Sequence, residues 1–472
     1  AQGELYMKRI LPLFISIILV SVTLLSGCGE KSRENQLQEA MSVSEDKLQE
    51  IFTDDIETCE YSQVSTYLNA WADDTAAVSV IYNGKTCTVL SNPATRGCEE
   101  EPSTALLCNV NTNNIQGSIK MISTATSCLL GPEEHGDIIL IFTETKDARY
   151  IGFKELPKKY LNCDNLINLQ SSGSDTILIG GPNYATAKFH KDGELAQTRY
   201  TNAYKISMTI PKYTDPYNYA KEHNFPSPVD TIGSLFASAM SAGRLFDIAS
   251  FNSEAVKGYN PYTASIVVVV DDNSVESITS RFDKTNENLQ EKFEKLEEDF
   301  EFTMEEVPMP EAVLSEDVSN NFLSLMYTLN TGACMQDENS GVINAASFIQ
   351  TVNTNEGNLD LSLDIRTRGE SFMDNICTEY ETTAGLCSTE FKCKKQGKLW
   401  SSDSKSELRK FFTDAVPLQP DKESDLSMRA YENDYITDIN PDLNMIIYTF
   451  EKGNRKTVLS NVLEFLDPAI EK

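Results

Sequence analysis

Short apolar segments separated by turn-rich stretches are the feature that most constrains the fold of this chain of 472 residues. Six such segments lie between residues 77 and 181: AVSVIY, CTVL, TALLCNV, DIILIF, NLINL and TILIGG. Their length and their β-branched residues are typical of buried strands. Residues 45–74 instead place apolar side chains at helical spacings. The first part of the chain is therefore predicted to form an α/β sheet domain.

A second pattern begins after residue 203. The segment DTIGSLFASAMSAGRLF predicts a helix, ASIVVVVDD a buried strand, NLQEKFEKLEEDFEF an amphipathic helix and GNLDLSLDIRTR a half-buried strand. The last residues return to the first pattern with SKSELRKFFTDAV, LNMIIYTF and TVLSNVLEFL. We therefore predict an α/β fold class, in which residues 45–203 and 398–472 form a mixed-sheet domain and residues 204–397 form an inserted α+β domain.

The N-terminal segment indicates export. Lys8 and Arg9 precede an apolar stretch from Ile10 to Leu25, and small residues then lead to Cys28. Basic residues, an apolar region and a small-residue cleavage site are the parts of a signal peptide. The ending Leu-Ser-Gly-Cys resembles a bacterial lipobox, which implies that Cys28 is diacylated and becomes the mature N-terminus. A plain transmembrane anchor is the alternative, although the stretch is shorter than the ~20 residues of a spanning helix.

Export to the extracytoplasmic face of a bacterial cell membrane changes the interpretation of the remaining cysteines. Residues 1–28 form the signal segment, and residues 29–44 are predicted to be a polar tether. Both an early and a late group of cysteines are even in number, and none shows a C-x-x-C spacing, so we expect structural disulfides within each group. Reduced core thiols are the alternative, and the sequence does not determine the pairing. The early group is Cys59, Cys87, Cys98, Cys108, Cys128 and Cys163, and the late group is Cys334, Cys377, Cys387 and Cys393.

Charge excludes one class of partner. The 71 acidic side chains outnumber the 40 basic ones, which gives a formal net charge of −31. Such a chain repels phosphate backbones. We therefore expect no nucleic-acid partner.

Five segments resemble those of a known enzyme family in amino-acid sequence and in their order along the chain. They are NPATRGCEEEPSTALLCNVN, IILIFTETKDARYIGFKEL, YLNCDNLINLQS, GNLDLSLDIRTR and YITDINPDLNMIIYTF. The chain resembles the aminoacyl-histidine dipeptidases (Xaa-His or cytosol non-specific dipeptidases), a family of two-metal zinc peptidases. The resemblance implies a zinc-exopeptidase-like domain with an inserted lid domain. Because lids in this group often dimerise, it also implies a homodimer through the lid domain.

The positions that match the family's metal site carry side chains that are mostly poor metal ligands. The family holds two zinc-type cations with imidazoles and carboxylates, and a glutamate activates the bridging water. Asn109 and Asn111 match the first metal segment, and carboxamides are poor zinc ligands. Lys146 and Asp147 match the base and its neighbouring ligand, and Gln170 matches a further aspartate. Only Asp147 keeps a ligand-capable side chain, and the Lys146 ammonium would repel a metal by several kcal/mol at an effective dielectric of ~20.

The residues alone agree with a chain that has no metal and no other cofactor. The histidines are His135, His190 and His223, and none lies in an HExxH or His-x-His motif. We interpret His135, which follows two glutamates, as a solvated surface group. A GxSxG nucleophile turn is also absent from the sequence.

One position retains recognition chemistry. Arg366 matches the family's lid arginine, which holds the terminal carboxylate of the substrate, and a guanidinium suits that bidentate contact. A strand-end salt bridge is the alternative, and Arg368 competes for the role.

We favour a lipid-anchored extracytoplasmic dipeptidase-like protein that has lost its metal ligands and catalytic base, and that binds peptides or acts as a scaffold. Its partners would be the membrane, through the N-terminal lipid, and peptides. An active, zinc-dependent Xaa-His-type dipeptidase with a different ligand set is one alternative. An interaction module without a ligand in the cleft is the other.

Overall fold

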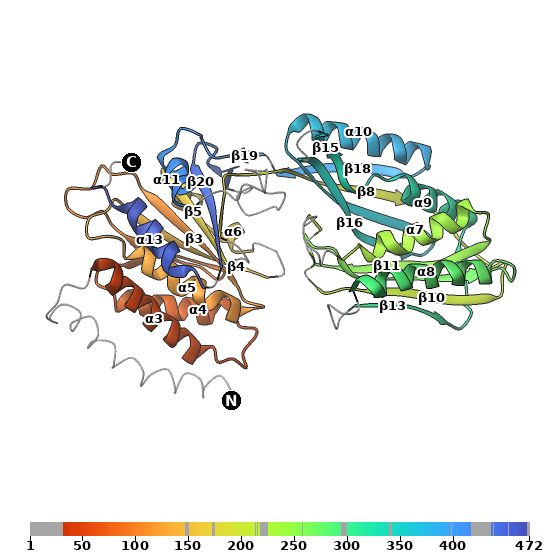
Figure 1. The fold of residues 1–472 in the computed structure, drawn as a ribbon, viewed down its shortest axis with the longest axis horizontal. Helices are drawn as coiled ribbons and strands as arrows, with labels where there is room; N and C mark the ends of the chain where they lie inside the picture. Colours follow the sequence, from red (N-terminus) through yellow and green to blue (C-terminus); the bar gives the residue numbers. More distant parts are fainter. Residues whose placement is uncertain are drawn as a thin grey trace. The chain divides into compact units, whose positions relative to one another are not determined.

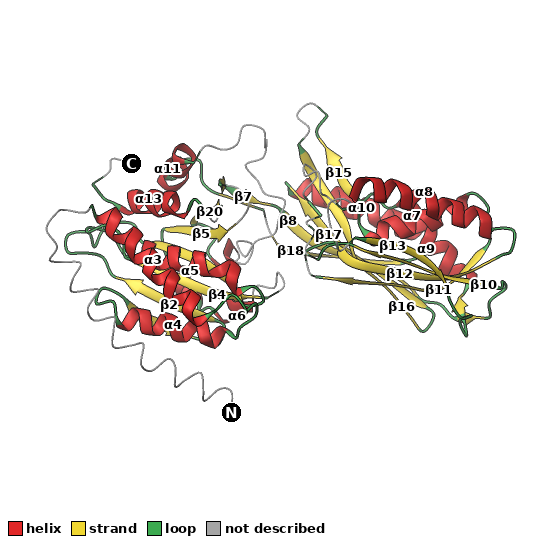
Figure 2. Ribbon diagram, turned by 60° about the horizontal axis from the view of Figure 1, so that its bottom comes forward, coloured by secondary structure: helices red, strands yellow, loops and turns green. Residues whose placement is uncertain are grey.

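The computed structural model describes residues 32–469, except 147–150, 172–174, 213, 215, 218–224, 257, 294–299, 339–341, 398, 417–435, 438 and 452. These residues form two compact units, and each contains both helices and strands (Figures 1 and 2). The first unit takes the described residues up to Gly180 and those from Ser401, and the second unit takes Gly181–Trp400.

A seven-stranded mixed sheet, in the order β1-β2-β4-β3-β5-β20-β6, organises the first unit. The four strands β4, β3, β5 and β20 run parallel, and β2 and β6 flank them antiparallel. Parallel strands are normally covered on both faces, which explains their continuous apolar sequences. The fold class predicted from the sequence is confirmed. The strands are β1 (Ser79–Asn83), β2 (Cys87–Asn92), β3 (Thr104–Asn111), β4 (Ile138–Thr145), β5 (Asn165–Ser171), β6 (Thr176–Leu178) and β20 (Asn444–Phe450).

Helices pack on this sheet. Helix α5 has buried residues on nearly all sides, since it contacts β3, β4 and β5 on one side and α3 on the other (Figure 2). Within the described residues, no helix has both the length and the apolar composition needed to cross a membrane. The helices are α3 (Arg33–Ile51), α4 (Tyr61–Asp73), α5 (Ile115–Leu129), α6 (Ile151–Glu155), the 3₁₀ helix η2 (Lys158–Leu161), α11 (Glu407–Ala415) and α13 (Arg455–Leu466).

Helix α3 corrects the prediction of a polar tether at residues 29–44, which is wrong from residue 33 onward. Ser32 caps the helix, and its hydroxyl accepts a hydrogen bond from the backbone N–H of Asn35 at 3.4 Å. Leu37, Met41 and Leu48 share one face of the helix and are buried in the core of the first unit. The segment is polar in composition, but its few apolar residues lie at helical spacing, and this periodicity decides its structure.

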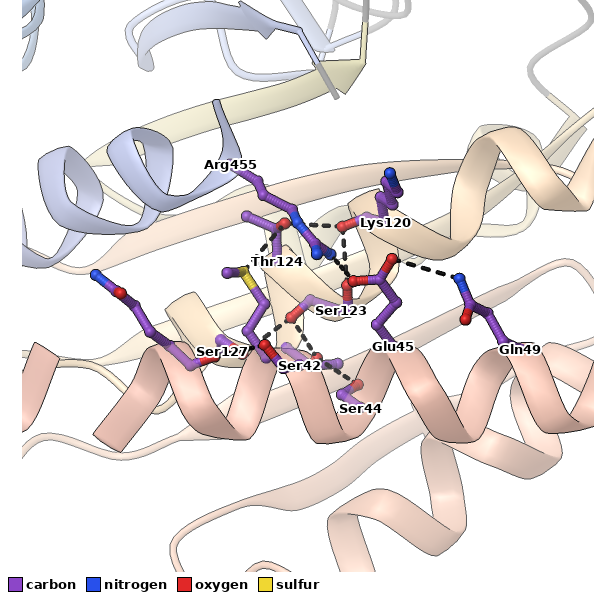
Figure 3. A network of polar contacts seen from close by, with 12 residues as sticks. Ser42, Ser44, Glu45, Gln49, Lys120, Ser123, Thr124, Ser127 and Arg455 are labelled. Carbon is purple, nitrogen blue, oxygen red and sulfur yellow. Dashed lines mark hydrogen bonds and ion pairs between the residues drawn. The ribbon is translucent and has the colours of Figure 1, made fainter. Parts of the chain in front are cut away.

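Polar side chains complete the docking of α3 (Figure 3). Glu45, on α3, forms an ion pair with Arg455 at the start of α13. The Ser44 hydroxyl bonds the Tyr67 hydroxyl at 2.5 Å and lies 3.5 Å from the Thr126 hydroxyl of α5. The helix is therefore held by apolar burial and by a satisfied polar network.

Two antiparallel sheets and four helices form the second unit. Their strand orders are β11-β12-β10-β13 and β15-β16-β17-β8-β18, and a short pair joins β9 with β14. The short strands β7 and β19, which pair with each other, contain the residues at which the chain passes from one unit to the other. The elements are β7 (Gly180–Gly181), β8 (Asn183–Lys191), β9 (Leu195–Ala196), β10 (Asn202–Thr209), α7 (Pro228–Ser241), β11 (Phe246–Ala255), β12 (Pro261–Val270), α8 (Val275–Phe293), β13 (Glu301–Glu306), β14 (Val313–Leu314), α9 (Glu316–Thr328), β15 (Gly332–Gln336), β16 (Ile343–Asn355), β17 (Asn358–Thr367), α10 (Glu370–Leu386), β18 (Glu390–Gly397) and β19 (Trp400–Ser401).

The sequence predicted that the inserted unit starts at residue 204. The structure places its start at Gly181, because strand β8 belongs to this unit. The strand pairs with β17 on one side and with β18 on the other, so its hydrogen bonds lie in the second unit. The sequence placed it with the preceding strands because pairing partners cannot be read from an apolar run. The unit ends at Trp400, close to the expected residue 397.

Ten cysteines lie within the described part of the chain, and all are free thiols. The disulfides expected from the sequence therefore stay a prediction. Cys28 and the signal segment lie outside the described residues.

Candidate functional site

The carboxyl ends of β3, β4 and β5 gather the positions that match the family's metal site. Asn109 of β3 pairs in register with Thr143 of β4, and Asn111 pairs with Thr145, the residue before Lys146. Gln170 lies at the matching end of β5. The carboxyl ends of parallel strands are the usual place for an active site in an α/β sheet. Asp147 lies outside the described residues.

Both asparagines have partners within the chain. The Thr143 hydroxyl donates to Asn109 Oδ1 at 2.6 Å, and both side chains are buried. Asn111 Oδ1 accepts from the backbone N–H of Asn113 at 3.0 Å, which stabilises the turn that leads into α5. These carboxamides support the backbone and the sheet.

Lys146 forms the main electrostatic contact of this region. Its Nζ lies 3.0 Å from Glu144 Oε1, and the Glu144 side chain is only 4 % exposed. The Thr112 hydroxyl donates to the same carboxylate oxygen at 2.7 Å. The hydrogen bond with Glu144 raises the pKa of Lys146. The ammonium is therefore held charged beside a buried carboxylate.

Glu144 is a residue that the sequence analysis missed. It lies near the end of β4, two residues after the apolar run Ile138–Phe142, at a position to which the family resemblance assigns no role. An acidic residue inside a buried strand needs a partner, and that rule was the available signal. The partner is Lys146, two residues further on.

Cys59 lies close enough to Glu144 for the two to interact electrostatically. Burial, followed by the negative charge of Glu144, raises the pKa of the Cys59 thiol to about 11. Because the thiolate is the nucleophile, this thiol is unsuited to covalent catalysis at neutral pH.

The described residues at this edge do not fit a pair of divalent cations. Gln170 is the last described position that matches a family ligand. Its Nε2 lies 3.5 Å from Asn168 Oδ1, so its side chain contacts another amide of the chain. Across the described ranges, no group of three or more His, Cys, Asp or Glu side chains is arranged to hold a metal ion. The carboxamides of Asn109, Asn111 and Gln170 and the Lys146 ammonium offer no deprotonated ligand, and the Glu144 carboxylate is already engaged by Lys146 and Thr112.

Arg366 lies in the second unit, near the end of β17. Its Nε is 2.8 Å from Asp364 Oδ1, and its side chain is 5 % exposed. The Tyr184 ring stacks on the guanidinium with its centroid 3.8 Å from Cζ, and the Tyr217 hydroxyl donates to Asp364 Oδ1 at 2.7 Å. The structure contains the strand-end salt bridge that was the alternative for Arg366. Its role in ligand binding stays a prediction.

The other candidate residues fall in different places. His135 is only 3 % exposed, so its interpretation as a solvated surface group is wrong. Its Nδ1 contacts Gly136 O at 2.7 Å, and its ring lies against Gly131. Arg368 donates from Nε to Ile343 O at 2.7 Å. His223 lies outside the described residues.

A mixed α/β sheet with an inserted α+β unit is a fold of the zinc-exopeptidase type. The aminoacylhistidine dipeptidase of Vibrio alginolyticus has a similar structure, with a TM-score of 0.62 at 14 % identity, over 92 % of this chain and 97 % of that one. An aminopeptidase PepT from Bacillus cereus gives a TM-score of 0.48 at 11 % identity, over 90 % of this chain and 97 % of that one.

Sequence comparison points the same way. The cytosol non-specific dipeptidase of Escherichia coli is 19 % identical over 275 residues, which are 58 % of this chain and 56 % of that protein. The match therefore spans little more than half of the relative's length. No protein-family model matches the sequence. The resemblance to dipeptidases is confirmed, and at these identities the structural likeness speaks for the fold alone.

Proposed function

We propose that this chain is a lipid-anchored, extracytoplasmic protein with a dipeptidase-like fold, which lacks metal-dependent peptidase activity and binds peptides or serves as a scaffold. The ion pair between Lys146 and the buried Glu144 carries the proposal. At the position that matches the family's catalytic glutamate, the chain has a cation held by its own neighbour.

The chemistry of this ion pair supports the loss of the catalytic base. A general base must offer a lone pair to the proton that it abstracts. The hydrogen bond with Glu144 raises the pKa of Lys146, so its ammonium has no free lone pair at neutral pH.

The same ion pair supports the loss of the metals. A divalent cation ~4 Å from the ammonium is repelled by about 8 kcal/mol at an effective dielectric of ~20. Glu144 offsets part of this repulsion, but Lys146 and Thr112 already engage one of its oxygens. Since about 1.4 kcal/mol corresponds to a tenfold change in affinity, we expect zinc binding to be weakened by several orders of magnitude.

Peptides are the ligand class that the comparisons favour, because the Vibrio alginolyticus relative is named for a dipeptide substrate. Arg366 is the residue of this chain suited to a peptide's terminal carboxylate. A bound carboxylate would have to share the guanidinium with Asp364. We therefore expect peptide affinity to be modest.

A calorimetric zinc titration of the chelator-stripped chain, from Gly29 onward, tests the loss of the metal site. We expect no sub-micromolar binding and no hydrolysis of aminoacyl-histidine dipeptides. Lys146→Glu is the matched variant, and it should bind zinc more tightly than the native chain. Two tight sites in the native chain, with hydrolysis that chelator abolishes, would refute the proposal and favour the active dipeptidase.

Thermal unfolding with a panel of dipeptides tests the ligand class. Stabilisation that Arg366→Lys weakens would support peptide binding in the inserted unit. An unchanged melting temperature at millimolar dipeptide would refute peptide binding and favour an interaction module without a cleft ligand.

A further inference from the structure

In the second unit, the edge strand β18 faces helix α10. Phe391, Cys393 and Lys395 are two residues apart on β18, so their side chains point to the same face of the sheet. Lys395 Nζ lies 2.6 Å from Asp374 Oδ1 and 3.4 Å from Glu370 Oε2, and both carboxylates are on α10. The face of β18 that carries Cys393 is therefore the face that contacts α10.

The helix presents a matching row of side chains. Glu370, Asp374 and Cys377 follow one another at spacings of four and three residues, which places them on one stripe of α10. A step of three residues along a helix advances by about 4.5 Å and a step of two residues along a strand by about 6.6 Å. One step from the Lys395–Asp374 contact therefore brings Cys393 opposite Cys377.

The thiols of Cys377 and Cys393 are neighbours, as these spacings predict. The Cys377 and Cys393 side chains lie close enough that each is the main influence on the pKa of the other. Both are half-buried and pack against the core of the second unit. The other late cysteines contact oxygen atoms: Cys334 Sγ lies 3.1 Å from Asn330 O, and Cys387 Sγ lies 3.8 Å from the Thr328 hydroxyl.

We propose that Cys377 and Cys393 form a disulfide that fastens the edge strand β18 to helix α10. This assigns one pairing within the late group of cysteines, which the sequence left open. It concerns the thiols alone and does not depend on the proposed loss of metals or on peptide binding.

The oxidant is a disulfide of an exchange partner, such as glutathione disulfide. The Cys393 thiolate attacks one sulfur of that disulfide, and the other sulfur leaves as a thiolate that takes up a proton. Cys377 then loses its proton and attacks Cys393 Sγ in the mixed disulfide, and the second partner thiol departs. Two protein thiols and one partner disulfide thus become one protein disulfide and two partner thiols.

The surroundings favour Cys393 as the attacking thiol. The hydrogen bond from Cys377, followed by the positive charge of Lys395, lowers the pKa of Cys393. The same hydrogen bond raises the pKa of Cys377, which keeps its proton until the second step. An attacking thiolate beside a cation and a protonated partner is the arrangement that speeds exchange.

The bond would stabilise an exposed part of the unit. Edge strands have unpaired backbone groups on one side and need protection from pairing with other chains. The disulfide would close a loop of about 15 residues that contains the end of α10, where Leu386 is 82 % exposed. It would fix this edge to the covering helix.

The experiment equilibrates the folded chain, from Gly29 onward, with glutathione buffers, blocks free thiols with N-ethylmaleimide and identifies linked peptides by mass spectrometry. We expect a peptide that joins Cys377 to Cys393 in oxidised buffer. Reduction should lower the melting temperature by several degrees in the native chain and leave it unchanged in the C377S/C393S variant. Circular dichroism of that variant establishes that it folds.

Two results would overturn the proposal. One is alkylation of both Cys377 and Cys393 in folded protein held in oxidised glutathione. The other is a linkage of either residue to Cys334 or Cys387. The variant Lys395→Gln tests the mechanism separately, because it should slow disulfide formation several-fold and shift its pH profile to higher pH. Lys392→Gln, on the same strand, should leave the rate unchanged.

Discussion

Replacing Lys146 by methionine tests the ion pair that carries the proposed function. Methionine is an unbranched side chain one atom shorter than lysine, and it carries no charge. The attraction over 3.0 Å is about 5 kcal/mol at an effective dielectric of ~20 before desolvation and side-chain ordering are subtracted. Loss of a partner from a fully buried pair costs about 3–5 kcal/mol, and exposed pairs contribute about 1 kcal/mol or less. Because the Lys146 side chain is 28 % exposed, we expect an intermediate loss of about 2 kcal/mol.

A double-mutant cycle isolates this value. The assay is urea unfolding at pH 7 of the native chain, Lys146→Met, Glu144→Gln and the double variant. We expect Lys146→Met to be destabilising in the native background and nearly neutral beside Glu144→Gln. Lys154→Met, an exposed lysine of the neighbouring helix α6, serves as the control and should change stability by less than about 0.5 kcal/mol. An equal loss in both backgrounds would refute the ion pair as the function of Lys146.

Three further predictions concern the N-terminus, helix α3 and a histidine. Cys28→Ser should abolish incorporation of a labelled fatty acid in an expressing bacterium, and Cys59→Ser should not; equal labelling of both variants would contradict anchoring at Cys28. Leu48→Ala should lower the free energy of unfolding by about 3 kcal/mol because Leu48 is fully buried, whereas the exposed Glu50→Ala should have little effect in the same urea titration. Hydrogen bonds to Asp192 and then Asp360 raise the pKa of His190 above its usual 6.5. Its stabilising contribution is therefore complete below pH 6.5 and lost as pH rises through the raised pKa, and His190→Gln should remove that part of the pH dependence of unfolding.

The sequence was informative where a local pattern determines the structure. The apolar runs that became β3, β4, β5 and β20 were recognisable because strands covered on both faces need no polar residues. The part of helix α3 before residue 45 was missed because its apolar residues Leu37 and Met41 lie among many polar ones and give a weak signal. Strand β8 was assigned to the wrong unit because its partners β17 and β18 lie more than 160 residues further along the chain.

The candidate site was predictable in position but incomplete in its contacts. Residue matches placed Asn109, Asn111, Lys146 and Gln170 at one edge of a sheet, and the structure brings those strand ends together. The matches could not reveal Glu144, since its role depends on burial and on the nearby Thr112 hydroxyl. For the same reason, the ion pair between Arg366 and Asp364 could be recognised only from the structure.

The docking of α3 also changes what lipid attachment would mean for this chain. With a tether up to residue 44, the first unit could move well away from the bilayer. With a helix docked from Arg33, which donates from its guanidinium to Leu130 O at 3.3 Å, only the link from Cys28 to Arg33 is left. A link of this length spans at most about 18 Å when fully extended. This is about two Debye lengths at physiological salt, so the link would keep the acidic unit near the bilayer, where repulsion from anionic lipids is only partly screened. Loss of the packing of α3 would lengthen this link, so under the proposed lipid attachment the docking of α3 would limit how far the unit can stand from the bilayer.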